Sequence, residues 1–127
     1  MQSNCPFCEE IFHKDKNLYE NNLAWVKESL GPVSDGHMLV IPKRHIADFF
    51  DSTKEEKVAI MELLDWAKAY VESKFKPDGY NIGVNCGQAA GQTVMHLHIH
   101  LIPRYKGDVE DPRGGVRGVI PSKIAYW

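Results

Sequence analysis

The sequence lacks the features that mark membrane-spanning, secreted and nucleic-acid-binding proteins. Its 127 residues contain no apolar run close to the roughly 20 residues that span a bilayer. The first eight residues have neither the basic start nor the apolar stretch of a signal peptide. The net charge of −2 gives no electrostatic reason to bind nucleic acid or a membrane surface. We therefore expect a cytoplasmic protein with no nucleic-acid or membrane partner.

Cysteine is also scarce, and its number is odd. Of the three cysteines, two form the pair Cys5-Pro6-Phe7-Cys8, so a secreted disulfide framework is not expected. Thiols at this spacing can chelate one metal ion, form a redox pair or simply be buried. The spacing alone leaves these three alternatives open.

No internal repeat or low-complexity tract divides the chain. At this length a single domain, residues 1–127, is large enough to bury a core. Glycine, proline and charged residues are frequent from residue 104 onward. That composition predicts an irregular tail over about 104–127, packed over the domain or over a partner subunit.

One stretch of the chain has a regular alternation that ends at Pro103. It consists of the residues His96, Leu97, His98, Ile99, His100 and Leu101. Strict alternation predicts a half-buried strand, because successive strand side chains point to opposite faces. The aliphatic residues then enter the core, and the histidines stand in a row roughly 7 Å apart, at about 3.3 Å of rise per residue. Histidine serves as acid, base, nucleophile or metal ligand.

Other strands and one helix are expected around this row. Short apolar segments predict strands at 18–19, 23–27, 37–41 and 80–85. A helix is expected from near Thr53 to near Phe75, with overlapping capping boxes from Ser52 to Glu55 and from Thr53 to Glu56. Its core-facing stripe is predicted to include Val58, Met61, Leu64, Ala67, Val71 and Phe75, and to be widened by Ile60, Leu63 and Tyr70.

A loop of small residues, 86–91, precedes the histidine row. It lacks the Gly-Lys-Ser/Thr sequence that completes a nucleotide-binding P-loop. Its glycines can bring backbone N–H groups, together with Gln92 and Thr93, beside the histidines.

Three separate motifs in this sequence resemble the histidine triad (HIT) family. They are the histidine run at 92–102, the segment Gly36–His45, and Asn85 at the family's distance before the histidines. The resemblance covers roughly residues 5–105. It implies an α+β fold, with an antiparallel sheet of about five strands, one long helix and a short N-terminal segment. It also implies a homodimer formed through that helix and the adjoining strand.

The resemblance further implies an enzyme that cleaves phosphorus–oxygen or phosphorus–nitrogen bonds. Family members bind nucleotides and attack the α-phosphate with the middle histidine, here His98, forming a nucleotidyl-histidine. His100 matches a donor beside the phosphate or leaving group, and His37 matches a further catalytic position. The implied substrates are purine nucleotides or dinucleotides, and the motif leaves open dinucleoside polyphosphates, nucleoside phosphoramidates and nucleotidyl-sugars.

Other positions match residues of the family that bind substrate. Gln92 and Thr93 match residues that hydrogen-bond the phosphate oxygens, and Asn85 and His100 match residues lining the pocket. The acidic position that binds ribose is matched by Glu28 or Ser29, and the sequence leaves both open. Asp35 replaces the proline that commonly precedes the Gly-His pair.

Some branches of the family bind structural zinc, which gives the N-terminal cysteines a role. The matching ligands are Cys5, Cys8, His45 and His96. Two cysteines and two histidines form a closed tetrahedral set of the structural type, without a position for catalytic water. Zinc is thus the implied cofactor, and it would pin the N-terminal segment to the histidine strand.

Two further hypotheses compete with that of a nucleotidyl enzyme. A non-catalytic nucleotide sensor or scaffold protein would keep the pocket and act through partners. A catalytic metal site built from the three histidines is disfavoured, because strand positions about 7 Å apart exceed the reach of metal–ligand bonds of about 2 Å. No Asp or Glu stands beside the row to supply a further ligand.

Overall fold

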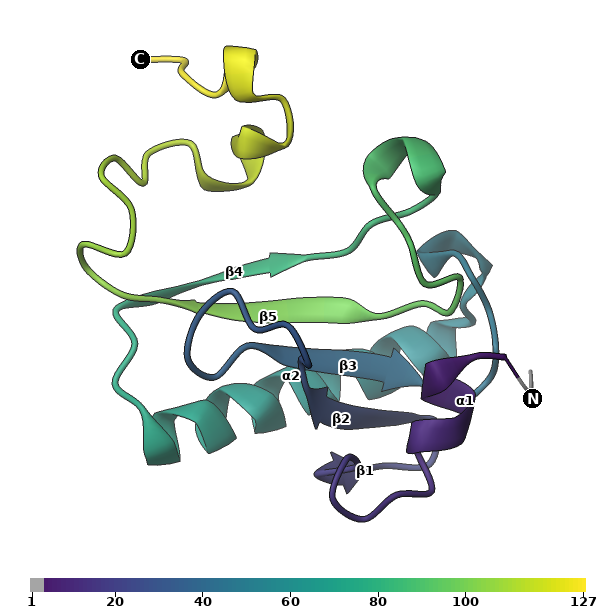
Figure 1. Cartoon of the computed structure of the whole chain (residues 1–127). Helices are drawn as coiled ribbons and strands as arrows, with labels where there is room; N and C mark the ends of the chain where they lie inside the picture. The colour runs from purple at the N-terminus through teal and green to yellow at the C-terminus, as the bar shows by residue number, and fades with distance from the viewer. Residues whose placement is uncertain (1–3) are drawn as a thin grey trace.

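The computed structural model describes residues 4–127, so the first three residues of the predicted domain lie outside it. A five-stranded antiparallel sheet has the long helix α2 (Lys54–Lys74) on one face and the short helix α1 (Pro6–Glu10) on the other (Figure 1). The predicted α+β fold is confirmed. Across residues 4–127, no helix has the length and apolar character needed to cross a membrane.

The sheet has the strand order β1-β2-β3-β5-β4. Its strands are β1 (Tyr19–Glu20), β2 (Ala24–Glu28), β3 (Met38–Pro42), β4 (Gly79–Gly83) and β5 (Ile99–Arg104). Each lies at a predicted position, with the ends shifted by a few residues. Because β3 is the middle strand, it joins the N-terminal hairpin of β1 and β2 to the C-terminal pair of β4 and β5.

The histidine strand is shorter at its start than the alternation predicts. Val40 pairs with Ile99, and continuing that register would place Leu97 opposite Pro42. Proline has no N–H to donate to a strand neighbour. The backbone N–H of Leu97 instead donates to the carbonyl of Ile46 at 2.7 Å. His96, Leu97 and His98 are therefore extended chain ahead of β5 and not part of the ladder.

At its other end β5 continues through Pro103 to Arg104, where the sequence predicts a stop. The pairing with β3 ends at Met38 and Leu101, so β3 has already ended when β5 reaches Pro103. On that side the Pro103 carbonyl accepts a hydrogen bond from the Ser34 hydroxyl at 2.7 Å. A missing N–H there costs no strand–strand hydrogen bond.

The long helix begins as expected, and most of its predicted stripe faces the sheet. Thr53 caps it, and the box with Glu56 is formed, whereas the Ser52 hydroxyl donates to the Phe49 carbonyl, so the box from Ser52 is wrong. The sheet-facing residues are Ala59, Ile60, Leu63, Leu64, Ala67 and Val71. Val58 and Met61 are 50% and 54% exposed, and their prediction as core residues is wrong.

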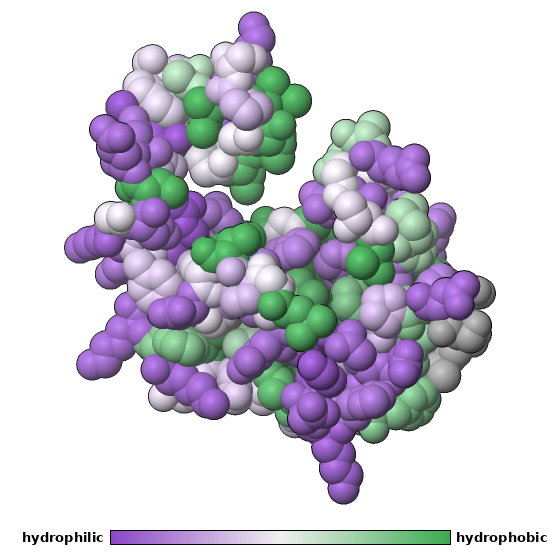
Figure 2. Space-filling model, in the orientation of Figure 1, coloured by the Kyte–Doolittle hydropathy of each residue, from purple (hydrophilic) through white to green (hydrophobic). Residues whose placement is uncertain are grey.

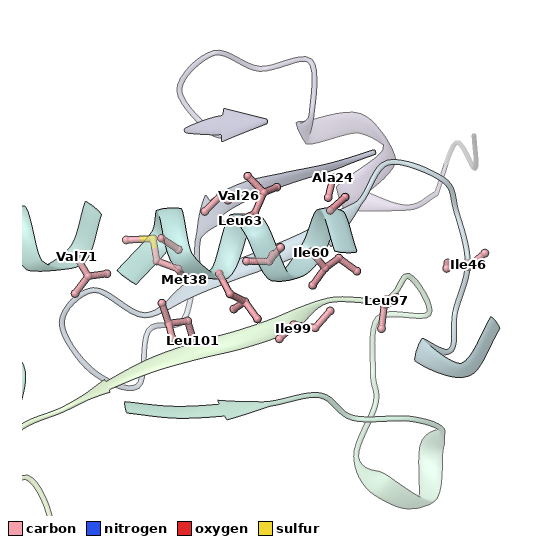
Figure 3. Packing of buried hydrophobic residues seen from close by; sticks show 14 residues of the cluster. Ala24, Val26, Met38, Ile46, Ile60, Leu63, Val71, Leu97, Ile99 and Leu101 are labelled. Atoms are coloured by element: carbon pink, nitrogen blue, oxygen red, sulfur yellow. The ribbon is translucent and has the colours of Figure 1, made fainter. Parts of the chain in front are cut away.

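The main core lies between α2 and the sheet (Figure 3). Leu97, Ile99 and Leu101 point into it, as the alternation predicts, and each is at most 4% exposed. Burying an aliphatic side chain of this size stabilises a fold by about 1.5–3 kcal/mol. That gain fixes the faces of the strand and directs the histidines to the opposite side.

A smaller apolar cluster covers part of the opposite face. It contains Cys5, Phe7 and Cys8, in and beside α1, and the strand residues Trp25, Leu39, Ile41. The short helix therefore lies on the same face of the sheet as the histidine row.

The chain after β5 forms a tail that extends beyond β4 (Figure 1). It contains two short 3-10 helices, η3 (Gly115–Val119) and η4 (Pro121–Lys123). The guanidinium groups of Arg113 and Arg117 lie over the rings of Trp127 and Tyr126, so they hold the tail to itself. Figure 2 shows an open gap between this tail and the loop that precedes the histidines.

Candidate functional site

Strand register places the third histidine of the row beside a residue with no side chain. His100 pairs with Leu39 on one side and with Gly83 on the other. His37 directly precedes β3, and its Nε2 lies 2.9 Å from Nδ1 of His100. The structure thus brings together His37 and His100, which are 63 residues apart.

Hydrogen bonds determine which nitrogen of each of these two rings carries the proton. The backbone N–H of Val33 donates to Nδ1 of His37 at 3.1 Å. A neutral His37 therefore carries its proton on Nε2 and donates it to Nδ1 of His100. The remaining nitrogen of His100, Nε2, then carries a proton and is a hydrogen-bond donor for a ligand.

Burial keeps this pair of rings neutral. It lowers the pKa of His37, and it lowers the pKa of His100 to about 4, with smaller contributions from the nearby His98 and His37 rings. At pH 7 both rings are uncharged, so the tautomers described above are the ones present.

The middle histidine has the opposite arrangement. Nδ1 of His98 lies 2.9 Å from the carbonyl oxygen of His96, which can only accept a hydrogen bond. Nδ1 therefore carries the proton, and Nε2 keeps a free lone pair. An imidazole held in this tautomer is suited to attack an electrophile. Its ring centroid lies 5.1 Å from that of His100.

The first histidine belongs to a second cluster. Nε2 of the buried His96 lies 2.8 Å from the Pro42 carbonyl, so its Nδ1 is the atom without a proton in the neutral ring. That Nδ1 lies 3.3 Å from Sγ of Cys5, 3.5 Å from Sγ of Cys8 and 3.1 Å from Nδ1 of His45.

These four ligand atoms all lie within 4.8 Å of one another, and three of the four residues are buried. Two thiols and two imidazole nitrogens converging in this way fit a tetrahedral metal site. The structure therefore brings together all four residues predicted as metal ligands.

Gln92 is buried, and its side-chain amide forms hydrogen bonds with the protein backbone. Its Oε1 accepts from the Gly87 N–H at 2.8 Å, and its Nε2 donates to the carbonyls of Ala47 and Val94 at 2.8 and 3.2 Å. These bonds fix the loop that precedes the histidines.

Thr93 and Asn85 are exposed. Thr93 lines a hollow of about 320 Å³ together with Cys5 and His45. Asn85 lies two residues beyond β4. The contacts of Gln92, Thr93 and Asn85 with phosphate or nucleoside stay predictions.

The two alternatives for the ribose position line the same hollow beside His37 but have different bonded neighbours. Glu28 lies two residues after the buried Val26, so it is on the face of the sheet that α2 covers. The pKa of Lys74 on α2 is raised mainly by Tyr70, and the charge of Glu28 makes a smaller contribution. Ser29 is half-buried, and its N–H donates to the carbonyl of His37 at 3.0 Å. Of the two, Ser29 is thus the one hydrogen-bonded to His37, the partner of His100.

Sequence reasoning missed three contributors to this site. They are Phe7, whose ring contacts His98, the Val33 N–H, and the buried ion pair of Lys27 with Glu10. The position of Phe7 between two predicted metal ligands was a usable signal, because His96 was predicted in the same cluster. A backbone N–H and a lysine in an alternating strand carry no such signal.

Comparison with known proteins agrees with this geometry. The sequence profile of the HIT domain matches residues 12–107. The bis(5'-adenosyl)-triphosphatase of Dictyostelium discoideum is 37% identical over 101 residues, which cover 80% of this chain and 68% of that protein.

Two solved structures extend the likeness. A HIT family protein from Bacillus anthracis has 36% identity and a TM-score of 0.77, over 85% of this chain and 78% of that one. A Zn-bound histidine triad family protein from Mycobacterium smegmatis has 38% identity and a TM-score of 0.71, over 85% and 80%. Because the profile covers most of the chain and these relatives exceed 35% identity, the chain belongs to the histidine triad (HIT) family.

Proposed function

We propose that the protein is a nucleotidyl hydrolase or transferase that acts at the α-phosphate of its substrate. The observation that carries this proposal is the pair of complementary tautomers on neighbouring rings. His98 offers a free lone pair on Nε2, and His100 offers an N–H on Nε2. A nucleophile beside a fixed hydrogen-bond donor is what displacement at phosphorus requires.

In the first step Nε2 of His98 forms a bond to the α-phosphorus while the bond to the leaving group breaks. The leaving group departs with that electron pair, as a phosphate anion from a polyphosphate or as an amine that takes a proton from the solvent, and the proton on Nδ1 of His98 stays hydrogen-bonded to the His96 carbonyl. His100 donates a hydrogen bond to the phosphate oxygens and keeps its proton, because losing it would create an imidazolate. Water or another acceptor then attacks phosphorus and loses a proton to the solvent, and the electron pair of the P–N bond returns to Nε2 of His98.

The proposed substrates are purine nucleotides or dinucleotides, with dinucleoside polyphosphates and nucleoside phosphoramidates as the two classes to compare. The Dictyostelium relative named as a bis(5'-adenosyl)-triphosphatase supports the first class. Thr93 is proposed to contact the phosphate directly, and Gln92 to orient the loop that contacts it. Asn85 is assigned to the pocket lining. For the ribose we propose Ser29 in preference to Glu28, which lies on the side of α2.

We propose zinc as the metal for Cys5, Cys8, His45 and His96. The bare Nδ1 of His96 and the convergence of the four ligand atoms support this, as does the Zn-bound relative from Mycobacterium smegmatis. Bound zinc would join α1 to the start of the histidine strand and leave no coordination position for water. Since Cys5, Cys8 and Cys86 form no disulfide, a reducing compartment, the cytoplasm, is proposed.

A homodimer is proposed through β4 and α2. β4 is an edge strand with Ile82 54% exposed, and α2 presents Val58 and Met61 outward. An open edge and exposed apolar side chains favour pairing with a second copy. The tail, including the 80% exposed Val119, would then pack against the partner subunit. Sedimentation of the purified protein at a single chain mass would refute this.

A substrate panel tests the proposed activity. Wild type, His98→Ala and the control His13→Ala are each assayed with a diadenosine polyphosphate and with an adenosine phosphoramidate. His13 is exposed and is not among the residues of the site described above. We expect His98→Ala to lose at least about 1,000-fold in kcat, because it removes the nucleophile, and His13→Ala to be unchanged. Tight binding without turnover by wild type would instead favour the non-catalytic sensor.

A further inference from the structure

The short helix α1, which contains Cys8 and directly follows Cys5, cannot hold its position by its own hydrogen bonds. α1 has five residues, and isolated helices below about 12–15 residues are marginal in water. One end is attached through Cys5 and Cys8 to the cysteine–histidine cluster. At the other end, Glu10 accepts a hydrogen bond from Nζ of Lys27 at 2.8 Å.

The ion pair is a firm attachment because it is buried. The Lys27 side chain is 2% exposed and that of Glu10 is 15% exposed. A charge withdrawn from water in this way strongly favours keeping its partner. The position of α1 is therefore set at one end by the cysteine–histidine cluster and at the other by this ion pair.

Phe7 lies between these two attachments and reaches the histidine row. Its side chain is 6% exposed, and its ring centroid lies 5.1 Å from that of His98, with the planes at 67°. It also meets His96 at 5.8 Å and 84°. Both are edge-to-face contacts, the favoured geometry for two aromatic rings. The Lys27 ammonium lies 5.6 Å from the same Phe7 ring centroid.

His98 depends on such contacts for its orientation. A single hydrogen bond from Nδ1 to the His96 carbonyl fixes its tautomer but leaves the ring able to rock about that bond. The edges of Phe7 and His100, each 5.1 Å away between centroids, limit the rocking. Attack on phosphorus needs the lone pair aligned closely, since a misplacement of about 1 Å can cost about 100-fold in rate.

We propose that Phe7 is a positioning residue for His98, and that metal loading of the Cys5–Cys8–His45–His96 cluster sets how firmly Phe7 holds the nucleophilic ring. The kinetic half of this inference rests on the function proposed above. When the cluster is empty, only the ion pair and apolar packing hold α1, so the ring of Phe7 moves and the ring of His98 moves with it.

The test begins with the free protein, so that it does not depend on turnover. The ring nitrogen and carbon signals of His98 are recorded by NMR for zinc-loaded wild type, chelator-stripped wild type, zinc-loaded Phe7→Leu and zinc-loaded Phe7→Ala. We expect one narrow set of signals in loaded wild type, broadened or shifted signals in the stripped protein and in Phe7→Ala, and an intermediate result in Phe7→Leu. Phe49→Ala removes a ring that packs against the other core, and it should leave the His98 signals unchanged.

Kinetics supply the second readout. We expect zinc-loaded Phe7→Ala to lose about 10- to 100-fold in kcat with little change in KM, because the nucleophile is misaligned while the substrate contacts remain. Wild-type His98 signals and wild-type kcat in both zinc-loaded Phe7 variants would overturn the proposal. If wild type turns over no substrate, the proposed function fails, and the NMR comparison still decides whether Phe7 holds His98. If Phe7→Ala does not fold, the signals of Phe7→Leu and of stripped wild type decide the same question.

Discussion

His96 and His98 lie two residues apart, yet their neighbours leave opposite nitrogen atoms free. The Pro42 carbonyl accepts a hydrogen bond from Nε2 of His96 and leaves Nδ1 free as the proposed metal ligand. The His96 carbonyl accepts one from Nδ1 of His98 and leaves Nε2 free as the proposed nucleophile. At the scale of single residues, then, two backbone carbonyls assign two chemically identical side chains to different tasks.

The lowered pKa of His100 predicts a loss of stability in acid. Its ordinary pKa is 6.5, and burial, with His98 and His37 nearby, lowers it to about 4 in the folded protein. Between these values the unfolded chain binds a proton that the folded chain does not. The free energy of unfolding therefore falls as the pH falls from 6.5 to 4, by about 3 kcal/mol, and is little affected by this group above 6.5.

Urea unfolding of wild type and His100→Asn at several pH values measures this contribution. We expect wild type to lose more stability than the variant across that window, because the variant has no group to protonate there. Parallel pH dependences for the two proteins would show that His100 is not held neutral by the fold.

At the scale of elements, alternation and capping predicted which segments form strands and helix, and which face of β5 is buried. The ends of β5 were not predictable, because they depend on where β3 stops opposite it, at Pro42 and at Met38. The outward position of Val58 and Met61 was likewise hidden. A helix with apolar residues on more than one face does not state which face meets the sheet.

Gly36 lies in the turn directly before His37, and a side chain at this position would be strained and crowded. Its φ is +88°, and a Cβ there would lie 3.1 Å from Cγ1 of Val71 and 3.2 Å from the ring of Phe75. We expect Gly36→Ala to lower the free energy of unfolding by about 2 kcal/mol, from backbone strain and crowding against α2.

Gly31→Ala is the matched control, because no atom lies within 4 Å of its Cβ position and its φ is not in the left-handed region. The free energy of unfolding, measured with denaturant, should change by less than about 0.5 kcal/mol for this variant. Equal losses in the two variants would contradict the structural role assigned to Gly36.

At the scale of the whole molecule, the fold brings the two ends of a long stretch of chain to one point. Cys5 and His96 are 91 residues apart and lie 3.3 Å apart between Sγ and Nδ1. Spacing could not show this, because Cys-x-x-Cys suits several roles and nothing local selects its distant partners. The resemblance to a family supplied the four ligands, and the structure places them together. Phe7 and Lys27 act through the tertiary fold and have no local signature.

Metal removal should reveal how much the cluster contributes to the whole fold. We expect purified protein to carry about one zinc per chain, and chelation or Cys8→Ser to lower Tm by at least about 5 °C, because metal binding is coupled to folding. Cys86→Ser changes the third cysteine, which lies outside the cluster, and should keep both zinc and Tm. Absence of zinc from both wild type and Cys8→Ser would refute the metal site.

The central claim is that His98 attacks phosphorus, and trapping the covalent intermediate tests it most directly. Wild type is mixed with a dinucleoside polyphosphate, quenched in alkali within the first turnover, digested and analysed by mass spectrometry. We expect a nucleoside monophosphoryl group on His98 that is absent from His98→Ala. Turnover that persists in His98→Ala, or an adduct on a different residue, would contradict it.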